Sequence, residues 1–190
     1  FETIGPTIGK ETTINALKAV VIASILIVLY IAWSFRKVPK PASGVRFGVS
    51  AVIALIHDVL VVVGVFAIFG KLFGVEVDSL FVTALLTVIG FSVHDTIVVF
   101  DRIRENLRRE TAPFPQVVND SILQTIDRSL NTSLTVVLVL FALLLFGGAS
   151  IRWFVVALLV GVTSGTYSSI FNASPILVVW QEWVDKRKKK

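Results

Sequence analysis

Two His-Asp pairs lie inside long apolar runs of the chain, at positions 57–58 and 94–95. The first stands in IHDVLVVVG. The second stands in GFSVHDTIVVFDRIREN, where apolar sequence turns abruptly into alternating acidic and basic residues. A carboxyl group inside such a run is costly, and it is generally found facing a bundle interior or a path for ions. Asp58 and Asp95 are therefore the residues most suited to chemistry, and that chemistry is the uptake and release of a proton or another cation.

Arg128 is the third ionisable residue at the edge of an apolar run, and its depth matches that of Asp95. At about 1.5 Å per residue, Asp58 lies about 16 Å into its run, near the middle of a bilayer. Asp95 lies about 8 Å from the end of its own run, and Arg128 opens the next one. An arginine close to a carboxyl favours the charged form of that carboxyl. Because arginine itself stays charged, a moving Arg128 is suited to switch Asp95 between holding and releasing a proton.

Each of these residues also has a purely structural interpretation. Asp95 and Arg128 would form a static salt bridge between two helices. Asp58 would accept a helix-capping or interhelical hydrogen bond, with His57 or a Ser or Thr hydroxyl as its partner. His57 and His94 are better suited to be hydrogen-bond partners of the neighbouring carboxylates than carriers of protons, so we take them as possible modulators of the site.

The sequence around these residues is that of an all-α integral membrane protein. Of the 190 residues 55% are hydrophobic, the mean hydropathy is +0.84, and only 16% are charged, against about 25% in soluble domains. A helix that spans a bilayer needs about 20 mostly apolar residues. The runs lack the alternation of a membrane barrel, the other structure that satisfies its backbone in lipid. The predicted spanning helices cover residues 14–35, 47–69, 80–100, 126–146 and 153–180.

The basic residues predict how these five helices cross the membrane. Of the 18 Lys and Arg residues, fourteen fall in three segments that lie on one side if the helices alternate, namely 36–46, 101–128 and the tail 184–190. Basic residues of short loops stay in the cytoplasm. The N-terminal lead-in, residues 1–13, is therefore expected outside and the C-terminus inside. A start outside the membrane suggests an earlier helix, followed by an external domain, that is absent from this chain.

Other features narrow the class of protein. No Cys is present, and two His are too few for a histidine-only metal site, so no metal or cofactor is expected. The pI of about 9.7 is explained by membrane topology, so no nucleic-acid partner is expected. Segment 101–127 predicts two amphipathic helices at the inner membrane face, broken at Pro113 and Pro115, either as a connector or as a partner-binding surface. Gly161 and Gly165 predict close packing of the last helix inside the bundle.

Several motifs together resemble the SecF family, the smaller partner in the SecD–SecF protein-export apparatus of bacteria. They occur in the family's order and cover nearly the whole chain: ALIHDVLVVVG, GFSVHDTIVVFDRIREN, FGGASIRWFVVALLVG and GTYSSIFNASP. The opening FETIGPTIGKE is similar to the segment that leads from the family's external domain into its second helix. The GTYSSI ending favours SecF over SecD, either as a separate subunit or as the SecF half of a fused SecDF chain.

The resemblance implies a fold and a set of site residues. The family belongs to the resistance-nodulation-division (RND) superfamily, and its unit has six helices with an external domain between the first and second. The five spans here would be the second to sixth. By position, Asp95 matches the acidic residue that the family uses for proton passage, and Arg128, in TIDRSLNTS, matches the arginine associated with it. Asp58 matches a His-Asp motif of the third helix. His94 stands where many relatives have Asn.

The resemblance also implies a function, which is not enzymatic. Such a protein uses the proton-motive force across the bacterial cytoplasmic (inner) membrane to assist late preprotein translocation and release. Its expected partners are SecD, the SecY-containing translocon, the lipid bilayer, and the preprotein through the missing external domain. Proton and sodium remain open as the coupling ion. Two other functions stay open: an RND-type exporter of small molecules or lipids, and a passive scaffold for the translocon.

Overall fold

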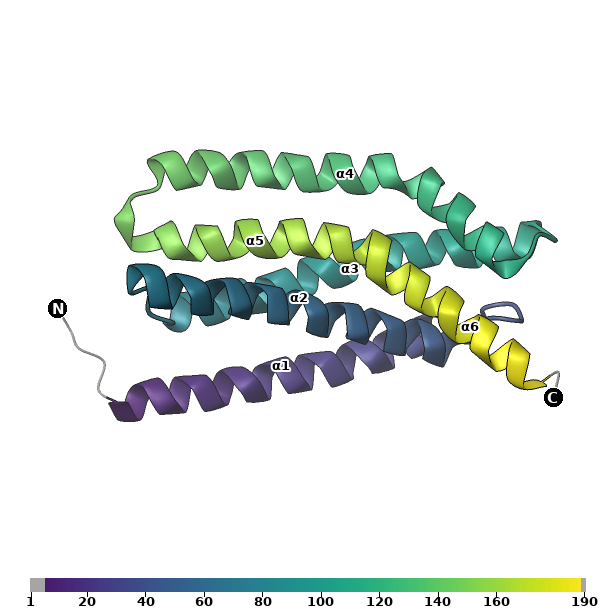
Figure 1. Cartoon of the computed structure of the whole chain (residues 1–190), viewed down its shortest axis with the longest axis horizontal. Helices are drawn as coiled ribbons and strands as arrows, with labels where there is room; N and C mark the ends of the chain where they lie inside the picture. The colour runs from purple at the N-terminus through teal and green to yellow at the C-terminus, as the bar shows by residue number, and fades with distance from the viewer. Residues whose placement is uncertain (1–5, 189–190) are drawn as a thin grey trace.

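The computed structural model describes residues 6–188, and within this range the regular structure is entirely helical (Figure 1). Two long helical hairpins are followed by a last helix that changes direction near its middle. The elements in chain order are α1 Pro6–Ser34, α2 Gly44–Phe73, α3 Ser79–Arg109, α4 Phe114–Phe146, the 3-10 turn η1 Ala149–Ile151, α5 Arg152–Ser168, the π-helical turn η2 Ser169–Ala173, and α6 Ser174–Lys188.

The helices have the length and composition needed to cross a membrane. Among the described residues, four helical stretches are long and apolar enough to do so: α2, α3, α4, and the continuous stretch Ala149–Arg187 formed by η1, α5, η2 and α6. The apolar part of α1, Lys18–Ser34, falls just short of that length. The predicted all-α membrane fold is confirmed. The first four predicted spans each overlap one helix, and the fifth covers most of α5, all of η2 and part of α6.

Helices α3 and α5 form the centre of the bundle because small residues let them approach closely. A Cβ atom added to Gly161 would lie 2.1 Å from Val88 Cγ2, and one added to Gly165 would lie 2.9 Å from the Cβ atom of Ser92. No side chain larger than hydrogen fits at Gly161 unless Val88 or the helix that carries it shifts. The spacing of the two glycines thus produces the close packing that the sequence predicts.

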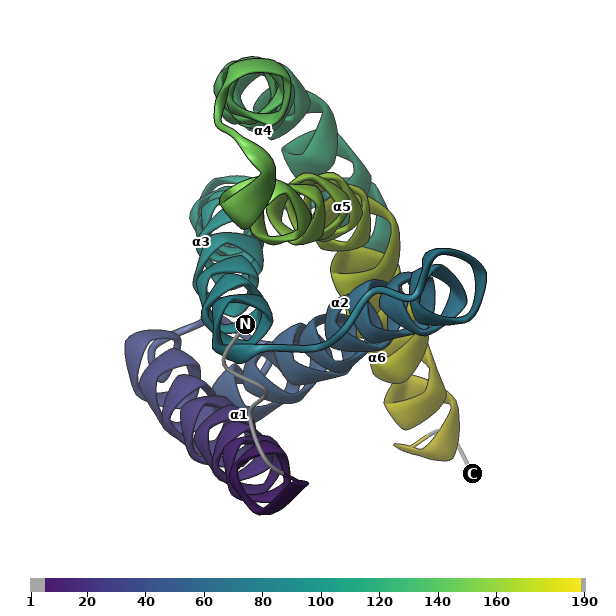
Figure 2. The ribbon, with the colours of Figure 1, turned by 90° about the vertical axis from the view of Figure 1, so that its left-hand side faces the viewer.

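Helices α1 and α4 lie at the periphery. Viewed along the bundle, α2, α3 and α5 surround its middle, and α1 and α4 lie on opposite sides of them (Figure 2). Much of α4 faces outward, including Leu130, Leu134 and Leu138, which are 50%, 55% and 59% exposed. Apolar side chains that face outward along a spanning helix suit contact with lipid or with another membrane protein.

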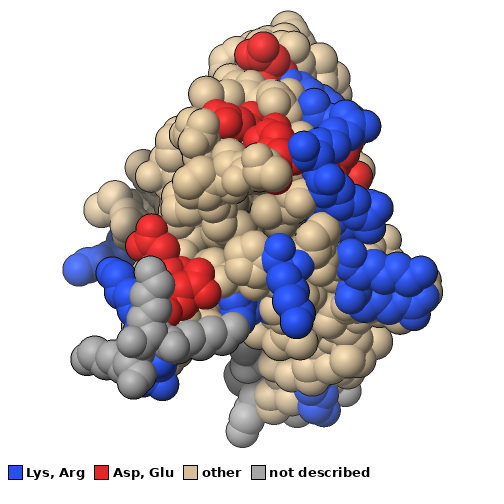
Figure 3. All heavy atoms as spheres, turned by 90° about the vertical axis from the view of Figure 1, so that its right-hand side faces the viewer, with Lys and Arg blue, Asp and Glu red and all other residues tan. Residues whose placement is uncertain are grey.

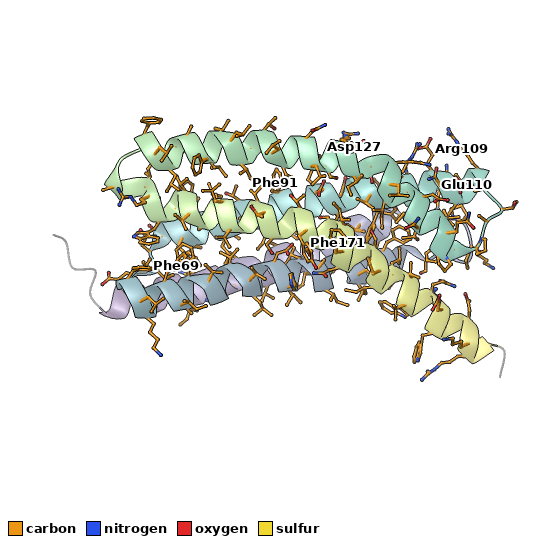
Figure 4. All side chains as sticks on the ribbon, turned by 45° about the horizontal axis from the view of Figure 1, so that its top comes forward. Phe69, Phe91, Arg109, Glu110, Asp127 and Phe171 are labelled. Atoms are coloured by element: carbon orange, nitrogen blue, oxygen red, sulfur yellow. The ribbon has the colours of Figure 1, made fainter. Side chains whose placement is uncertain are left out.

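The two ends of the bundle differ in chemistry. At one end, Phe66, Phe69 and Phe73 of α2 surround Trp153, with ring centroids 5.7–6.5 Å from the indole. Tryptophan, as at Trp153, is enriched at the boundary between membrane and water. The opposite end is basic: Figure 3 shows Lys and Arg side chains over much of its surface. Figure 4 labels Phe69 at the aromatic end and Arg109 at the basic end.

The polar segment 101–127 does not form the separate amphipathic helices that the sequence predicts. The chain does break near the prolines, between Arg109 and Phe114, but the two pieces continue α3 and α4 beyond the apolar runs. They pack on each other through Asn106, whose Nδ2 donates to Ser121 Oγ and Gln124 Oε1, each at 3.0 Å. These side-chain hydrogen bonds, one of them buried, hold the two pieces together as one hairpin.

Two further boundaries differ from the prediction. The lead-in segment 1–13 belongs to α1 from Pro6 onward, and residues 1–5 lie outside the described residues. The predicted basic tail begins inside α6, which continues to Lys188, and residues 189–190 lie outside the described residues. The last span is not one straight helix, because η2 separates α5 from α6, and α6 then diverges from the bundle axis (Figure 1).

Candidate functional site

Asp58 is buried on α2, and the side chains around it satisfy both of its carboxylate oxygens. Its exposed fraction is 1%. Ser92 Oγ of α3 donates to Oδ2 at 2.5 Å, and Ser164 Oγ of α5 donates to Oδ1 at 3.1 Å. His57 Nδ1 also lies 3.1 Å from Oδ1. Asp58 therefore joins three helices by hydrogen bonds, as in the structural interpretation that names His57 or a hydroxyl as its partner.

Asp95 is buried on α3, but only one of its oxygens has a partner. Ser129 Oγ of α4 donates to Oδ1 at 2.6 Å. Oδ2 is buried and has no hydrogen-bond partner within 3.5 Å among the described residues, and Ser169 is a second hydroxyl near this carboxylate. Buried polar atoms in folded proteins almost always have partners, so each exception calls for an explanation. A free carboxylate oxygen at this position is suited to take a proton or a cation.

Arg128 does not contact Asp95 in this structure, so the predicted pairing is not present. The structure brings α4 to Asp95 as expected, but it places Ser129 against the carboxylate and turns Arg128 outward. Within residues 6–188, no carboxylate oxygen lies within 4.0 Å of the Arg128 guanidinium. Figure 4 labels its neighbour Asp127 on α4. Helix α4 meets Asp95 one residue away from Arg128, at Ser129, and successive residues of a helix point about 100° apart.

The two histidines lie beside their carboxylates but do not occupy equivalent positions. The His57 side chain is 42% exposed and lines a groove of about 710 Å³ between α2 and α5, together with Ser164 and Tyr167. It reaches back to Asp58 through Nδ1. His94 faces outward, and no hydrogen bond joins it to Asp95 among the described residues. His57 is thus within hydrogen-bond distance of Asp58, whereas His94 has no hydrogen bond to Asp95 among the described residues.

A seam of hydroxyl groups lies between α3, α4, α5 and η2, and two of its members, Ser92 and Ser129, bond the two carboxylates. Ser133 and Thr166 hydroxyl oxygens lie 2.5 Å apart, and those of Thr96 and Ser169 lie 3.0 Å apart. The hydroxyl seam consists of Ser92, Thr96, Ser129, Ser133, Thr166 and Ser169, all of them buried. Hydroxyl hydrogens rotate, and each group both donates and accepts. The seam can therefore change bonding partners, at little cost, when a nearby carboxyl gains or loses a proton.

Sequence reasoning singled out the carboxylates but missed Ser129 and the hydroxyl seam. The signal was present: along α4 the hydroxyl residues Ser121, Thr125, Ser129 and Ser133 recur every four positions, which places them on one face of a helix. All four are buried. This stripe, and not the arginine beside it, is the face that α4 presents to the bundle.

The π-helical turn η2 lies next to the seam. Its first residue, Ser169, bonds Thr96 and donates to the carbonyl of Gly165 at 2.8 Å. Turns of this kind are rare and occur frequently at functional sites. Pro175 follows two residues after η2 and lacks the backbone N–H that a regular helix would use. The change of direction between α5 and α6 is thus located beside the candidate site.

With this geometry established, sequence comparisons identify the family. A family model described as "Protein export membrane protein SecD/SecF, C-terminal" matches residues 1–183. The chain belongs to this family. It is 62% identical over 182 residues to the protein translocase subunit SecF of Thermobaculum terrenum, covering 95% of this chain and 56% of that protein. It is 42% identical to the protein translocase subunit SecDF of Thermus thermophilus, covering 95% of this chain and 23% of that protein.

A solved structure agrees with this assignment to the SecD/SecF family. A crystal structure of SecDF in a super-membrane-facing form superposes with a TM-score of 0.80 at 39% identity, over 98% of this chain and 23% of that one. The resemblance drawn from the motifs is therefore confirmed. The chain spans 56%, 60% and 56% of the lengths of three SecF relatives that it matches.

Proposed function

We propose that this chain is the ion-coupling membrane part of a SecF-type subunit. In this proposal it works with SecD, uses the proton-motive force, and assists late translocation and release of preproteins at a SecY-containing translocon. It acts as a coupling device and not as an enzyme. The SecF and SecDF names of its relatives support the translocase assignment, and the free buried oxygen of Asp95 supports the ion-coupling role.

The observation that carries the proposal is the contrast in how the two carboxylates are bonded. Asp95 Oδ2 has no partner among residues 6–188, whereas both oxygens of Asp58 are occupied. A carboxyl group that must bind and release an ion needs an available oxygen and neighbours that can adjust. Ser129 supplies such a neighbour on α4. We assign ion binding to Asp95 and the joining of α2, α3 and α5 to Asp58.

Arg128 acts in this proposal through a movement of α4. It precedes Ser129 by one residue in α4 and faces outward, so a rotation of α4 about its axis would exchange one side chain for the other beside Asp95. The peripheral position of α4 (Figure 2) makes such a rotation feasible. With Arg128 near, Asp95 holds its charge; with Ser129 near, it accepts the ion.

The proposed topology follows the chemistry of the two ends. The basic end faces the cytoplasm and the aromatic end faces outward, so the chain enters from the outside and its C-terminus is cytoplasmic, in the bacterial inner membrane. The preprotein is gripped by an external domain outside residues 1–190, and ion flow through the bundle moves that domain. The hydroxyl seam suits either proton or sodium, and the proton is our choice because of the single unpaired carboxylate oxygen.

The test is completion of preprotein export in vesicles that contain the full-length protein and SecD, with and without an imposed ion gradient. Asp95→Asn is expected to reduce export under the gradient to the rate measured without it, while leaving assembly with SecD intact. Asp58→Asn is the matched control, since it changes a carboxylate to an amide on a neighbouring helix. Separate proton and sodium gradients identify the ion.

Unchanged gradient-driven export by Asp95→Asn would contradict the proposal and favour a passive scaffold for the translocon. Gradient-driven loss of a small molecule or lipid from the same vesicles, without any effect on preprotein, would instead favour the RND-type exporter. Loss of assembly with SecD in both variants would assign the two carboxylates the same structural role.

A further inference from the structure

A basic pocket lies at the end of α1, away from the two carboxylate sites. It is formed where the end of α1 and the turn after it pack against the polar C-terminal part of α3. Its volume is about 330 Å³. The side chains that line the pocket are Trp33, Ser34, Arg36, Lys37, Arg104 and Arg108. Four of these six are cations, on an end of the molecule where Figure 3 shows many basic side chains.

Most of the positive charge in this pocket is not neutralised by the protein. Arg104 pairs with Asp101, one turn earlier on its own helix. Arg36, Lys37 and Arg108 have no carboxylate within 4.0 Å among the described residues. Charges of the same sign held close together repel, so an anion in the pocket would stabilise this arrangement.

Backbone contacts fix the walls of the pocket. Arg108 Nη2 donates to the carbonyl of Lys37, and Arg104 Nη1 donates to the carbonyl of Ser34, each at 3.4 Å. The guanidinium of Arg104 also lies 5.4 Å from the centroid of the buried Phe35 ring. The two arginines of α3 are thus bonded to the end of α1 and to the turn that follows it, so the pocket is more than a set of independent surface side chains.

An apolar track leads from the pocket toward the middle of the membrane. Trp33 is 62% exposed in the last turn of α1, and the guanidinium of Arg36 lies 5.2 Å from its ring centroid. Leu29 and Leu26 precede Trp33 by four and seven residues, so they share its helix face, and they are 61% and 59% exposed. Tryptophan at the end of an apolar helix face marks the level of lipid headgroups.

We propose that this pocket binds an anionic phospholipid. Arg36, Lys37 and Arg108 contact the phosphate oxygens, for which an arginine fork is well suited, and an acyl chain lies along Trp33, Leu29 and Leu26. Basic pockets between spanning helices are a known form of lipid headgroup site. Free phosphate would use the cations alone, and an acidic protein segment would leave the apolar track without an occupant.

The test is a titration of the full-length protein in neutral detergent with phosphatidylglycerol, followed by native mass spectrometry of the bound lipid. Each cation that contacts the headgroup should contribute about five-fold in affinity, so the double variant Arg36→Gln, Arg108→Gln should bind about thirty-fold more weakly. The control variant Lys40→Gln, Lys186→Gln removes the same charge from the same end outside the pocket, and it should stay within about two-fold of wild type.

Three further measurements decide between lipid and other anions. Neutral phosphatidylcholine should bind far more weakly than phosphatidylglycerol, and glycerophosphoglycerol, which is the headgroup without acyl chains, should compete poorly, as should inorganic phosphate. Full competition by inorganic phosphate, or equal weakening in the pocket and control variants, would overturn the proposal. Loss of lipid binding when SecD is assembled, with Arg36→Cys cross-linking to an acidic segment of SecD, would also overturn it in favour of a protein partner.

Discussion

The His-Asp pairs of α2 and α3 look alike in sequence but have different surroundings. Asp58 has contacts with His57, Ser92 and Ser164 at both carboxylate oxygens, whereas Asp95 has Ser129 at one oxygen and no described partner at the other. The first carboxylate joins helices, and in our proposal the second uses its unbonded oxygen to bind an ion. Both acids are buried, so burial does not distinguish their roles. The difference lies in whether each carboxylate oxygen already has a hydrogen-bond partner.

The largest effect on stability is expected at the contact between α3 and α5, because both carboxylate sites lie beside this contact. Gly161→Ala should lower the free energy of unfolding by about 1–3 kcal/mol or more, because the new Cβ would lie 2.1 Å from Val88 Cγ2. Denaturant titration in detergent measures this. Gly90→Ala is the control, since no atom lies within 4 Å of its added Cβ, and equal stability of the two variants would contradict the packing described.

The next largest effect is a difference in stability between variants of the two carboxylates. Asp58→Ala removes the acceptor of two serine hydroxyls, and interhelical hydrogen bonds in membranes contribute about 0.6 kcal/mol each, so the loss should be about 1–2 kcal/mol. Asp95→Ala removes one bond and one unsatisfied buried oxygen, and it should be close to neutral in stability. Unfolding titrations of both variants in one detergent test the difference, and a greater loss in Asp95→Ala would reverse our assignment.

A smaller effect is expected from the serines that serve the two sites. Ser92→Ala and Ser129→Ala should each cost about 0.6 kcal/mol in stability, so unfolding does not distinguish them. Gradient-driven export should: Ser129→Ala leaves Asp95 without its described partner, whereas Asp58 keeps Ser164 in Ser92→Ala. We expect a change in gradient dependence in Ser129→Ala alone, and an equal change in Ser92→Ala would place ion coupling at both acids.

The smallest effect on stability is expected at Arg128. Its side chain faces outward, so Arg128→Gln should change the free energy of unfolding by less than about 0.5 kcal/mol, as should the control Arg109→Gln on the surface of α3. Export should still depend on Arg128 if α4 rotates. A large loss of stability would instead indicate that Arg128 has a partner within the bundle.

The sequence was sufficient to predict the helices, the grouping of basic residues at one end and the burial of the two acids. All of these depend on composition and on counting along the chain. It was not sufficient for Arg128, because depth follows from the number of residues whereas the direction of a side chain follows from which face of α4 packs inward. The inward face of α4 is indicated by the buried hydroxyl residues Ser121, Thr125, Ser129 and Ser133. The continuation of α3 and α4 through 101–127 was also missed, since buried bonds at Asn106 are tertiary contacts.

The most direct test of this account is infrared difference spectroscopy of the full-length protein in lipid during a pH jump or a step in sodium concentration. A buried carboxyl that takes up a proton gains a carbonyl stretching band, and sodium displaces that band. We predict that the band is present in wild type and in Asp58→Asn and is absent in Asp95→Asn. A band that persists in Asp95→Asn and disappears in Asp58→Asn would show that the ion binds at the other site and would contradict the account.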